Sequence, residues 1–175
     1  MQYFLTTARL GFRCWDAGDL RLAMELWGDP EVTAMIGGPF TEEMVRARLE
    51  KEIAQMRERG VQYWPIFLRE GGEHVGCAGL RPYRDEARVY ELGFHLRRAF
   101  WGQGFASEAG RAAIEYGFGT LGAKALFAGH HPKNEASRAV LVKLGFVREG
   151  EELYPPTGEM HPAYWLRREN FRFGI

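Results

Sequence analysis

The sequence has few cysteines, no long apolar run and no secretion signal. Its two cysteines, Cys14 and Cys77, are too few to hold a fold together by disulfides, and we expect them to be reduced. No uninterrupted apolar stretch reaches the roughly 20 residues that a membrane-spanning helix needs. The first residues lack the basic-then-apolar pattern of a signal peptide. These absences predict a cytoplasmic protein with no membrane partner.

Excess charge and metal-binding motifs are absent as well. Lys and Arg together number 23, and so do Asp and Glu, so we expect no field that attracts nucleic acid. The spacings HExxH and CxxC do not occur, and we expect no metal. With 175 residues, 46% of them hydrophobic, the chain is too apolar for disorder and fits one domain over residues 1–175.

The hydrophobic pattern predicts helices and strands in mixed order. We expect strands at 10–15, 63–69, 74–80, 89–96, 125–130, 146–153 and 163–168. We expect helices at 17–27, 42–59, 104–116 and 134–144. Thr41 and Asn134 are the expected N-caps of two of these helices, and Gly60 is an expected C-terminal residue. This order is typical of an α+β or mixed α/β protein with one central sheet and helices on both faces.

Two glycine-rich segments invite comparison with nucleotide-binding loops. Residues 117–122 match GxGxxG, but they follow a helix and precede a strand, the reverse of the dinucleotide-binding context. We interpret them as a connecting loop. Residues 101–106 follow a strand and open a helix, where glycines let backbone amides approach an anion at the positive helix end. This segment predicts a phosphate or pyrophosphate site, and a plain glycine turn is the alternative.

Two longer segments carry a family resemblance. Residues 100–118 (FWGQGFASEAGRAAIEYGF) and 131–150 (HPKNEASRAVLVKLGFVREG) together resemble the GNAT acetyltransferases, and more narrowly their ribosomal-protein N-terminal acetyltransferase branch. The motif Glu91-Leu92-Gly93-Phe94 resembles the family's fourth strand. The family's phosphate loop begins with Gln or Arg, where this chain has Trp101, while Gly104 and Ala106 match.

The resemblance implies a fold and a cosubstrate. The fold is a mostly antiparallel sheet of about seven strands, in which the fourth strand, 89–96, splays from the fifth, 125–130. The cosubstrate is acetyl-CoA, whose pyrophosphate would lie on the loop and whose pantetheine would pair with the fourth strand and with Asn134. The cofactor-binding residues it implies are Phe94, His95, Leu96, Trp101, Gly102, Gln103, Gly104, Phe105, Ala106 and Asn134.

Two residues are candidates for proton transfer. The resemblance implies that Ser137 protonates the leaving thiolate, and a solvent-facing serine is the alternative. Strand alternation places Glu91 beside Gly93, whose missing side chain leaves room for a substrate, so Glu91 is the candidate base. A salt-bridged sheet residue is the other interpretation of Glu91. The rival bases are His95, Glu152 and Glu159.

The predicted activity is acetyl transfer from acetyl-CoA to a primary amine, by direct transfer in a ternary complex. A protein or peptide N-terminus is the expected acceptor. A small amine (an aminoglycoside, a polyamine or an amino-acid derivative) and a non-catalytic coenzyme A-binding module are the alternatives. Residues 154–164 are long for a hairpin connection and rich in Pro and Tyr. We expect them to pack on the acceptor cleft of their own chain or on a second subunit, in a homodimer.

Overall fold

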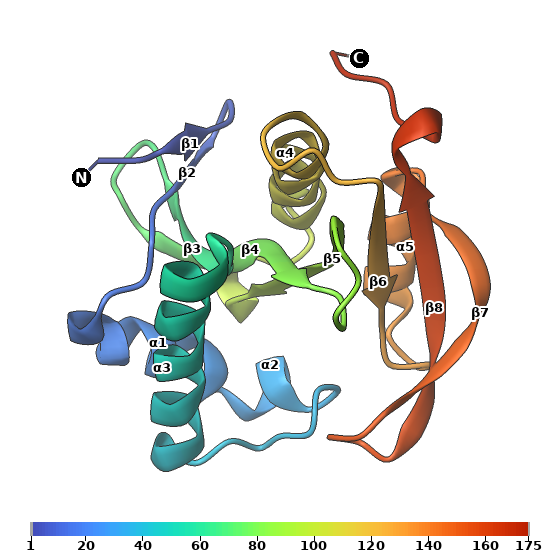
Figure 1. The fold of residues 1–175 in the computed structure, drawn as a ribbon. Coiled ribbons are helices and arrows are strands. Elements are labelled where there is room, and N and C mark those ends of the chain that lie inside the picture. The colour runs from blue at the N-terminus through green and yellow to red at the C-terminus, as the bar shows by residue number, and fades with distance from the viewer. Residues whose placement is uncertain (1, 175) are drawn as a thin grey trace.

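An eight-stranded sheet runs through the computed structural model, which describes residues 2–174 (Figure 1). Its order is β1-β2-β3-β4-β5-β6-β8-β7, and neighbours are antiparallel except for β5 and β6, which are parallel. The strands are β1 (Leu5–Thr6), β2 (Leu10–Phe12), β3 (Tyr63–Leu68), β4 (His74–Pro82), β5 (Val89–Leu96), β6 (Ala125–Gly129), β7 (Val147–Tyr154) and β8 (Glu159–Arg167). The α+β class is confirmed, and the sheet has one strand more than expected because the two-residue β1 carries no readable alternation.

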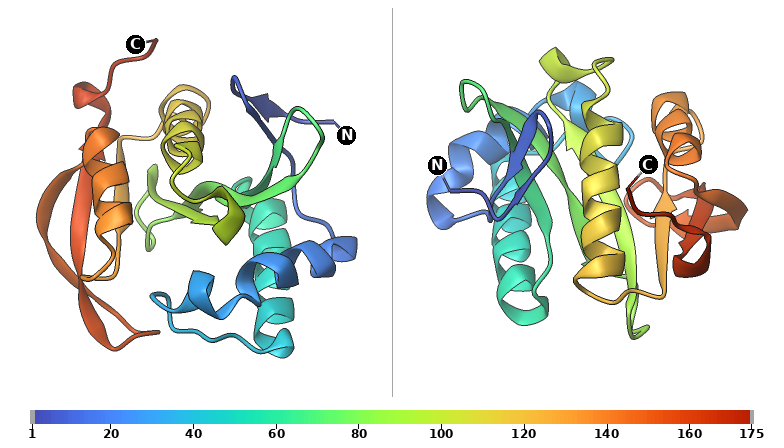
Figure 2. Two further views of the ribbon diagram at one scale, coloured as in Figure 1. Left: turned by 180° about the vertical axis from the view of Figure 1, so that it is seen from behind. Right: turned by 90° about the horizontal axis from the view of Figure 1, so that it is seen from above.

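Five α-helices cover both faces of this sheet. They are α1 (Leu20–Trp27), α2 (Pro30–Thr33), α3 (Glu42–Arg59), α4 (Phe105–Gly119) and α5 (Glu135–Lys143). Figure 1 shows α4 on one side of strands β3 to β5, and α1, α2 and α3 on the other. Figure 2 shows the same layers from behind and from above. Among residues 2–174, no helix is both long and apolar enough to cross a membrane.

The two faces of β5 belong to different cores. Leu92 and Leu96 are buried in the larger core, together with residues of α4 and α5. A smaller core lies on the other face and contains Trp27 of α1 and Leu49 of α3. Strand alternation predicted this division. Since burying one large apolar side chain contributes roughly 1.5–3 kcal/mol, the two cores hold β5 firmly between the helices.

Local signals at the helix ends behave as predicted. The hydroxyl of Thr41 accepts a hydrogen bond from the Met44 amide at 3.3 Å, and Gly60 ends α3 with a left-handed φ of 71°. The Asn134 side chain accepts from the Ser137 amide at 3.0 Å. These are ordinary capping interactions, each worth about 1 kcal/mol.

Three predicted boundaries differ from the structure. The strand expected at 10–15 ends at Phe12, and the chain then leaves the sheet, where the Trp15 amide donates to the Gln62 side chain at 2.8 Å. Residues 17–19 form a 3₁₀ turn ahead of α1. Helix α4 continues to Gly119, so the segment 117–122 is half helix and half loop. Its place after a helix and before a strand is as expected.

The segment 154–164 is not a long loop, contrary to expectation. Strand β7 continues through Tyr154 and β8 begins at Glu159, so residues 155–158 alone form the turn. The tip of this hairpin reaches the loop between α2 and α3 (Figure 1). A Cβ atom on Gly37 in that loop would lie 2.8 Å from the Cβ of Pro156. The hairpin therefore packs on its own chain, and Pro162 within β8 had disguised how early that strand begins.

The parallel strands β5 and β6 pair only where they begin. Three positions are paired: Val89 with Ala125, Tyr90 with Leu126, and Glu91 with Phe127. Beyond Glu91, β5 stays paired with β4 as far as Leu96, but its other edge has no strand partner. The predicted splay between these two strands is confirmed.

Candidate active site

The glycine loop before α4 has the backbone of an anion-binding turn. Gly102 and Gly104 have left-handed φ angles of 72° and 80°. A Cβ atom on Gly102 would meet nothing within 4 Å, so the loop is open where a ligand would approach. Gly104 is the N-cap of α4, and no side chain caps this helix end. The free amides and the positive end of a 15-residue helix suit a phosphate group.

The side chain of Arg9 supports this loop. No sequence pattern predicted this contact. Its Nε atom pairs with Glu108 of α4 at 2.6 Å, and its Nη1 donates to the carbonyl of Gln103 at 3.1 Å. The guanidinium carbon lies 4.2 Å from the centre of the Phe105 ring. Arg9 therefore holds the loop against α4 and adds positive charge beside Gly104.

The unpaired edge of β5 offers main-chain groups to a ligand. The Arg97 amide donates to Val75 at 2.9 Å, and the Val89 carbonyl accepts from the Tyr83 amide at 3.0 Å, so odd-numbered residues of β5 turn their amides toward β4. The amides of Phe94 and Leu96 then point to the open edge.

Because of this alternation, the three residues predicted to bind pantetheine do not all turn their amides to the open edge. The amide of His95 is directed toward β4 and is not available at the open edge, whereas those of its two neighbours are. The carbonyl of Leu96 already accepts from the Trp101 indole at 2.8 Å. Trp101 thus joins the glycine loop to this edge, which gives the departure from the family's Gln or Arg a structural role.

Glu91 stands at the last position where β5 and β6 pair. Burial raises the pKa of its carboxyl group, while Arg81, Arg48 and a hydrogen bond from Tyr63 oppose the rise. Arg81 is its direct cross-strand neighbour on β4. A raised pKa brings a carboxylate closer to the pH at which it can both take and release a proton.

The surroundings of Glu91 are more crowded than the sequence suggested. The Tyr63 ring occupies the space beside Gly93, where a Cβ atom would overlap ring carbon Cζ. The guanidinium of Arg81 lies 3.9 Å from the centre of that ring and pairs with the buried Glu52. Gly93 therefore makes room for Tyr63, and the expectation that it leaves a space for substrate is wrong.

The rival base on the same strand, His95, is held neutral. Its Nδ1 accepts a hydrogen bond from the Trp27 indole at 3.3 Å. Burial, with the charges of Arg48 and Arg81, holds the pKa of its imidazole well below the ordinary value. A base needs a free lone pair and a pKa near the working pH, and His95 has neither.

The two rival bases of the C-terminal hairpin are engaged in other contacts. Glu152 accepts a hydrogen bond from the Tyr83 hydroxyl and pairs with Arg84 at 3.0 Å. Glu159 pairs with His131 at 2.8 Å. Neither carboxylate is free to take a proton from an amine without losing these partners.

Asn134 and Ser137 lie together at the start of α5. The Oδ1 of Asn134 is used by the cap, which leaves its Nδ2 group free to donate to a ligand. Ser137 is half-buried in the first turn of the helix. A cap and a binding role are therefore compatible at Asn134, as expected.

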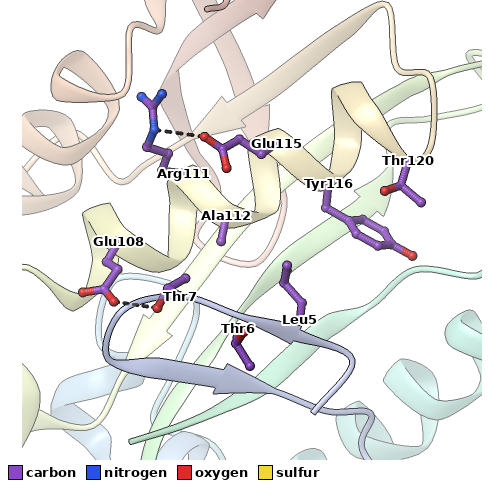
Figure 3. A pocket seen from close by; sticks show the side chains of 9 residues that line it. All are labelled: Leu5, Thr6, Thr7, Glu108, Arg111, Ala112, Glu115, Tyr116 and Thr120. Carbon is purple, nitrogen blue, oxygen red and sulfur yellow. Dashed lines mark hydrogen bonds and ion pairs between the residues drawn. The ribbon is translucent and has the colours of Figure 1, made fainter. Parts of the chain in front are cut away.

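Two surface pockets are lined by other residues. The larger, of about 450 Å³, runs between β1 and α4 (Figure 3), and Thr7, Glu108 and Tyr116 are among its lining residues. The second, of about 390 Å³, is lined by His130, Arg138 and Tyr164, among others. None of the predicted site residues lines either pocket. Within residues 2–174, no group of three His, Cys, Asp or Glu residues is close enough to hold a metal.

Known proteins resemble this chain in sequence. An N-acetyltransferase of uncharacterized role, p20 of Bacillus licheniformis, is 33% identical over 148 residues, 83% of each chain. An FsC-acetyl coenzyme A-N(2)-transacetylase of Aspergillus fumigatus is 31% identical over 94% of this chain and 79% of its own.

Solved structures resemble it in fold. A GNAT-family acetyltransferase of Bacillus anthracis has a TM-score of 0.79 and 28% identity over 94% of this chain and 98% of its own. A ribosomal L7/L12 alpha-N-protein acetyltransferase has a TM-score of 0.78 at 19% identity, over 95% of this chain and 94% of its own, a likeness of fold alone.

The match to a family model decides the classification. Residues 9–147 match the model described as "Acetyltransferase (GNAT) domain". This range contains the splayed strands, the glycine loop before α4, and the Asn134 cap. With the matching sequences and folds, it shows that the chain belongs to the GNAT family of N-acetyltransferases.

Proposed function

We propose that this protein moves the acetyl group of acetyl-CoA to a primary amine by direct attack in a ternary complex. One arrangement carries the proposal: the unpaired edge of β5 has Glu91 where it begins and the open glycine loop where it ends, at Leu96. The loop and helix end bind phosphate, the strand edge binds an amide-containing chain, and the carboxylate takes a proton. Acetyl-CoA and an amine require these three functions.

The chain would hold acetyl-CoA along a defined path. The pyrophosphate would take the amides of residues 102–106, and the pantetheine would pair with Phe94 and Leu96. The Nδ2 of Asn134 would donate from the opposite side. The same strand-edge amides are suited to stabilise the oxyanion that forms when the thioester carbonyl is attacked.

The transfer needs three proton movements. Glu91 takes a proton from the acceptor ammonium, and the free amine forms a bond to the thioester carbonyl carbon. The tetrahedral intermediate then collapses, its C–S bond breaks, and the thiolate of coenzyme A leaves. Ser137, or water beside it, gives a proton to that sulfur and is reprotonated by the second proton that the attacking nitrogen loses. The products are an amide and coenzyme A.

A covalent acetyl-cysteine route is disfavoured by the environment of Cys77. Its thiol is fully buried and lies 3.7 Å from Nδ1 of His95. Burial raises the pKa of this thiol to about 12, and only the thiolate is strongly nucleophilic. Because Trp27 already occupies Nδ1 of His95, the imidazole is not available to remove the thiol proton.

Two classes of amine are candidate acceptors. The family resemblance implies a protein or peptide N-terminus. The hairpin tip packs against Gly37, in the loop between α2 and α3 (Figure 1), and this additional cover favours a small amine. The name of the Aspergillus relative, a coenzyme A-dependent N(2)-transacetylase, agrees with that second candidate.

The setting of the reaction is part of the proposal. Free thiols at Cys14 and Cys77 suit the reducing cytoplasm, and we place the protein there. The homodimer stays a prediction, which a mass measurement in solution will test.

The glycine loop provides the experiment. We expect acetyl-CoA to bind to the wild type in calorimetry, and Gly104→Val to weaken binding at least tenfold, because a branched side chain at a left-handed residue distorts the loop. Gly122→Val is the matched control, since Gly122 has a φ of 62° and open space around it but lies in the other glycine-rich segment. Equal acetyl-CoA affinity in wild type and Gly104→Val would contradict the proposed site, and binding of NAD would contradict the family assignment of the loop.

A further inference from the structure

The guanidinium group of Arg48, on α3, is partly buried and has no ion-pair partner among residues 2–174. Its Nε atom is buried and makes no hydrogen bond, and among residues 2–174 no carboxylate lies within ion-pair distance of its guanidinium. The guanidinium carbon lies 4.7 Å from the centre of the Trp27 ring. By contrast, Arg46 on the same helix pairs with Glu42 at 3.0 Å. Burial, with the charge of nearby Arg81, lowers the pKa of Arg48, as is expected for a cation that has lost water without gaining an ion pair.

This cation lies on the same face of the sheet as Glu91. Trp27, on which Arg48 stacks, donates its indole hydrogen bond to His95 of β5. Burial raises the pKa of both Glu91 and Tyr154, the last residue of β7, and the charge of Arg48 opposes the rise in each. Arg48, Glu91 and Tyr154 therefore lie near one another on this face of the sheet, which also carries α1 and α3.

Two of the four charged groups on this face are not in an ion pair. Arg81 is neutralised by its buried ion pair with Glu52. One cation, Arg48, and one carboxylate, Glu91, are left without a charged partner of their own. A ligand that brings an ammonium group to Glu91 and an anionic group to Arg48 would complete both sites. A guanidinium forms its best-defined ion pair with a carboxylate, through two parallel hydrogen bonds.

We propose that Arg48 binds a carboxylate of the acceptor, and that the acceptor is an amino acid or a similarly small compound bearing both a primary amine and a carboxylate. This inference rests on the acetyl transfer proposed above and narrows its acceptor. It disfavours polyamines and aminoglycosides, which Arg48 would repel. It also disfavours peptide N-termini, where the carboxylate beside the amine has become an amide.

Matched acceptors test the inference. Initial rates of thiol release from acetyl-CoA are measured with a panel of free amino acids, the carboxamide of each, and the amine left when its carboxyl group is removed. We expect at least one free amino acid to react with a kcat/KM roughly 10²-fold above its carboxamide, because the neutral amide cannot replace the ion pair. The preference should appear mainly in KM, since the carboxylate takes no part in bond making.

Variants at two positions of α3 test whether Arg48 is responsible for the preference for the free acid. Arg48→Gln should lose the roughly 10²-fold preference for the free acid, so that its kcat/KM falls much further with the free acid than with the decarboxylated amine. Arg48→Lys, which keeps the charge but not the paired donors, should retain part of it. Arg46→Gln is the control and should leave all three acceptor classes unchanged. Acetyl-CoA affinity and melting temperature, measured for each variant, establish that the fold and the cosubstrate site are intact.

The outcomes separate this inference from the proposed function. If carboxamides, peptides or decarboxylated amines react as well as the free acids, or if Arg48→Gln lowers the rate with every acceptor equally, the carboxylate site is wrong and the acetyl transfer stands. If no free amino acid reacts while another amine does, the inference is overturned in the same way. If acetyl-CoA does not bind and no amine releases its thiol, the proposed function fails too.

Discussion

The ring of Tyr63 lies against the backbone of Gly93, in contact close enough that a Cβ atom on Gly93 would overlap ring carbon Cζ. Tyr63 is fully buried on β3, and its amide donates to the Glu52 side chain at 2.9 Å. One tyrosine thus links helix α3, strand β3 and the strand that carries Glu91. The position of Glu91 depends on this packing.

Substitution of Gly93 should expose that dependence. We expect Gly93→Ala to lower the free energy of unfolding by about 1–3 kcal/mol, because the added methyl group must displace a buried ring. In a Tyr63→Leu background the same substitution should cost less. Denaturant unfolding of the four proteins in this cycle measures the coupling. Gly129→Ala is the control, since a Cβ atom there would have neighbours at an ordinary 3.5 Å. Equal costs for Gly93→Ala in both backgrounds would contradict the contact.

Glu91→Gln tests the proposed base. We expect kcat to fall by roughly 10²-fold or more, as is typical when a general base is lost. Because Glu91 acts deprotonated, wild-type activity should fall as the pH drops through its pKa, and burial places that midpoint above the ordinary value of 4.5. The variant should lack this acidic limb.

Glu152→Gln is the comparison for that variant, since Glu152 is already bound by Tyr83 and Arg84. A pH–rate profile that is unchanged in Glu91→Gln but altered in Glu152→Gln would transfer the role of base to the hairpin.

Two variants separate the capping role of Asn134 from its proposed role in binding acetyl-CoA. Asn134→Asp keeps an oxygen to accept from the Ser137 amide, so the stability of α5 should be retained, but it loses the Nδ2 donor and should bind acetyl-CoA more weakly. Asn134→Ala should lose the donor and, in addition, about 1 kcal/mol of stability. Thermal unfolding and calorimetry measured on both variants decide this. A wild-type acetyl-CoA affinity in Asn134→Asp would leave Asn134 as a cap and nothing more.

Ser137→Ala tests the proposed acid. We expect a lower kcat with unchanged acetyl-CoA affinity, because the hydroxyl acts only when the thiolate leaves. The loss should shrink with an acetyl donor whose thiol is more acidic, since such a leaving group needs less help from an acid. A kcat equal to that of the wild type would assign the proton to water.

The stability of the protein should fall in mild acid because of His74. This side chain is buried between the rings of Trp15 and Phe67 and is within 3.0 Å of the Gly76 carbonyl. Burial, with the charge of Arg97, lowers its pKa to about 4 from an ordinary 6.5. The unfolded chain then binds this proton first, so stability is full above pH 6.5 and is lost as the pH falls toward 4.

The size of this loss follows from the shift. A change of about two and a half pH units corresponds to roughly 3 kcal/mol for His74, and His95, whose pKa is lowered in the same direction, steepens the fall. Unfolding by guanidinium chloride between pH 7.5 and 4.5 measures it, and His74→Gln should flatten the curve. A wild-type stability that stays constant over this range would contradict the buried neutral histidine.

Local chemistry was sufficient to predict much of this protein from its sequence. The caps at Thr41, Gly60 and Asn134, the alternation of β5 and the glycine loop before α4 all depend on neighbours within a few residues. Backbone hydrogen bonding and side-chain periodicity act over such short separations, so a single sequence reveals them. The family resemblance extended these local signals to the fold and the cosubstrate.

Only the tertiary structure decided which charges and rings meet. Tyr63 beside Gly93, Trp27 on His95, and the contact of Arg9 with Glu108 join residues that lie 30 to 99 positions apart. The long hairpin and the unpartnered Arg48 likewise became visible only when distant segments were brought together. Residue types at such separations carry no periodicity that marks them as neighbours. The sequence therefore determined where the glycine loop before α4 and the strand of Glu91 lie. The packing of distant segments determined that Glu91 and Arg48 are left without ion pairs.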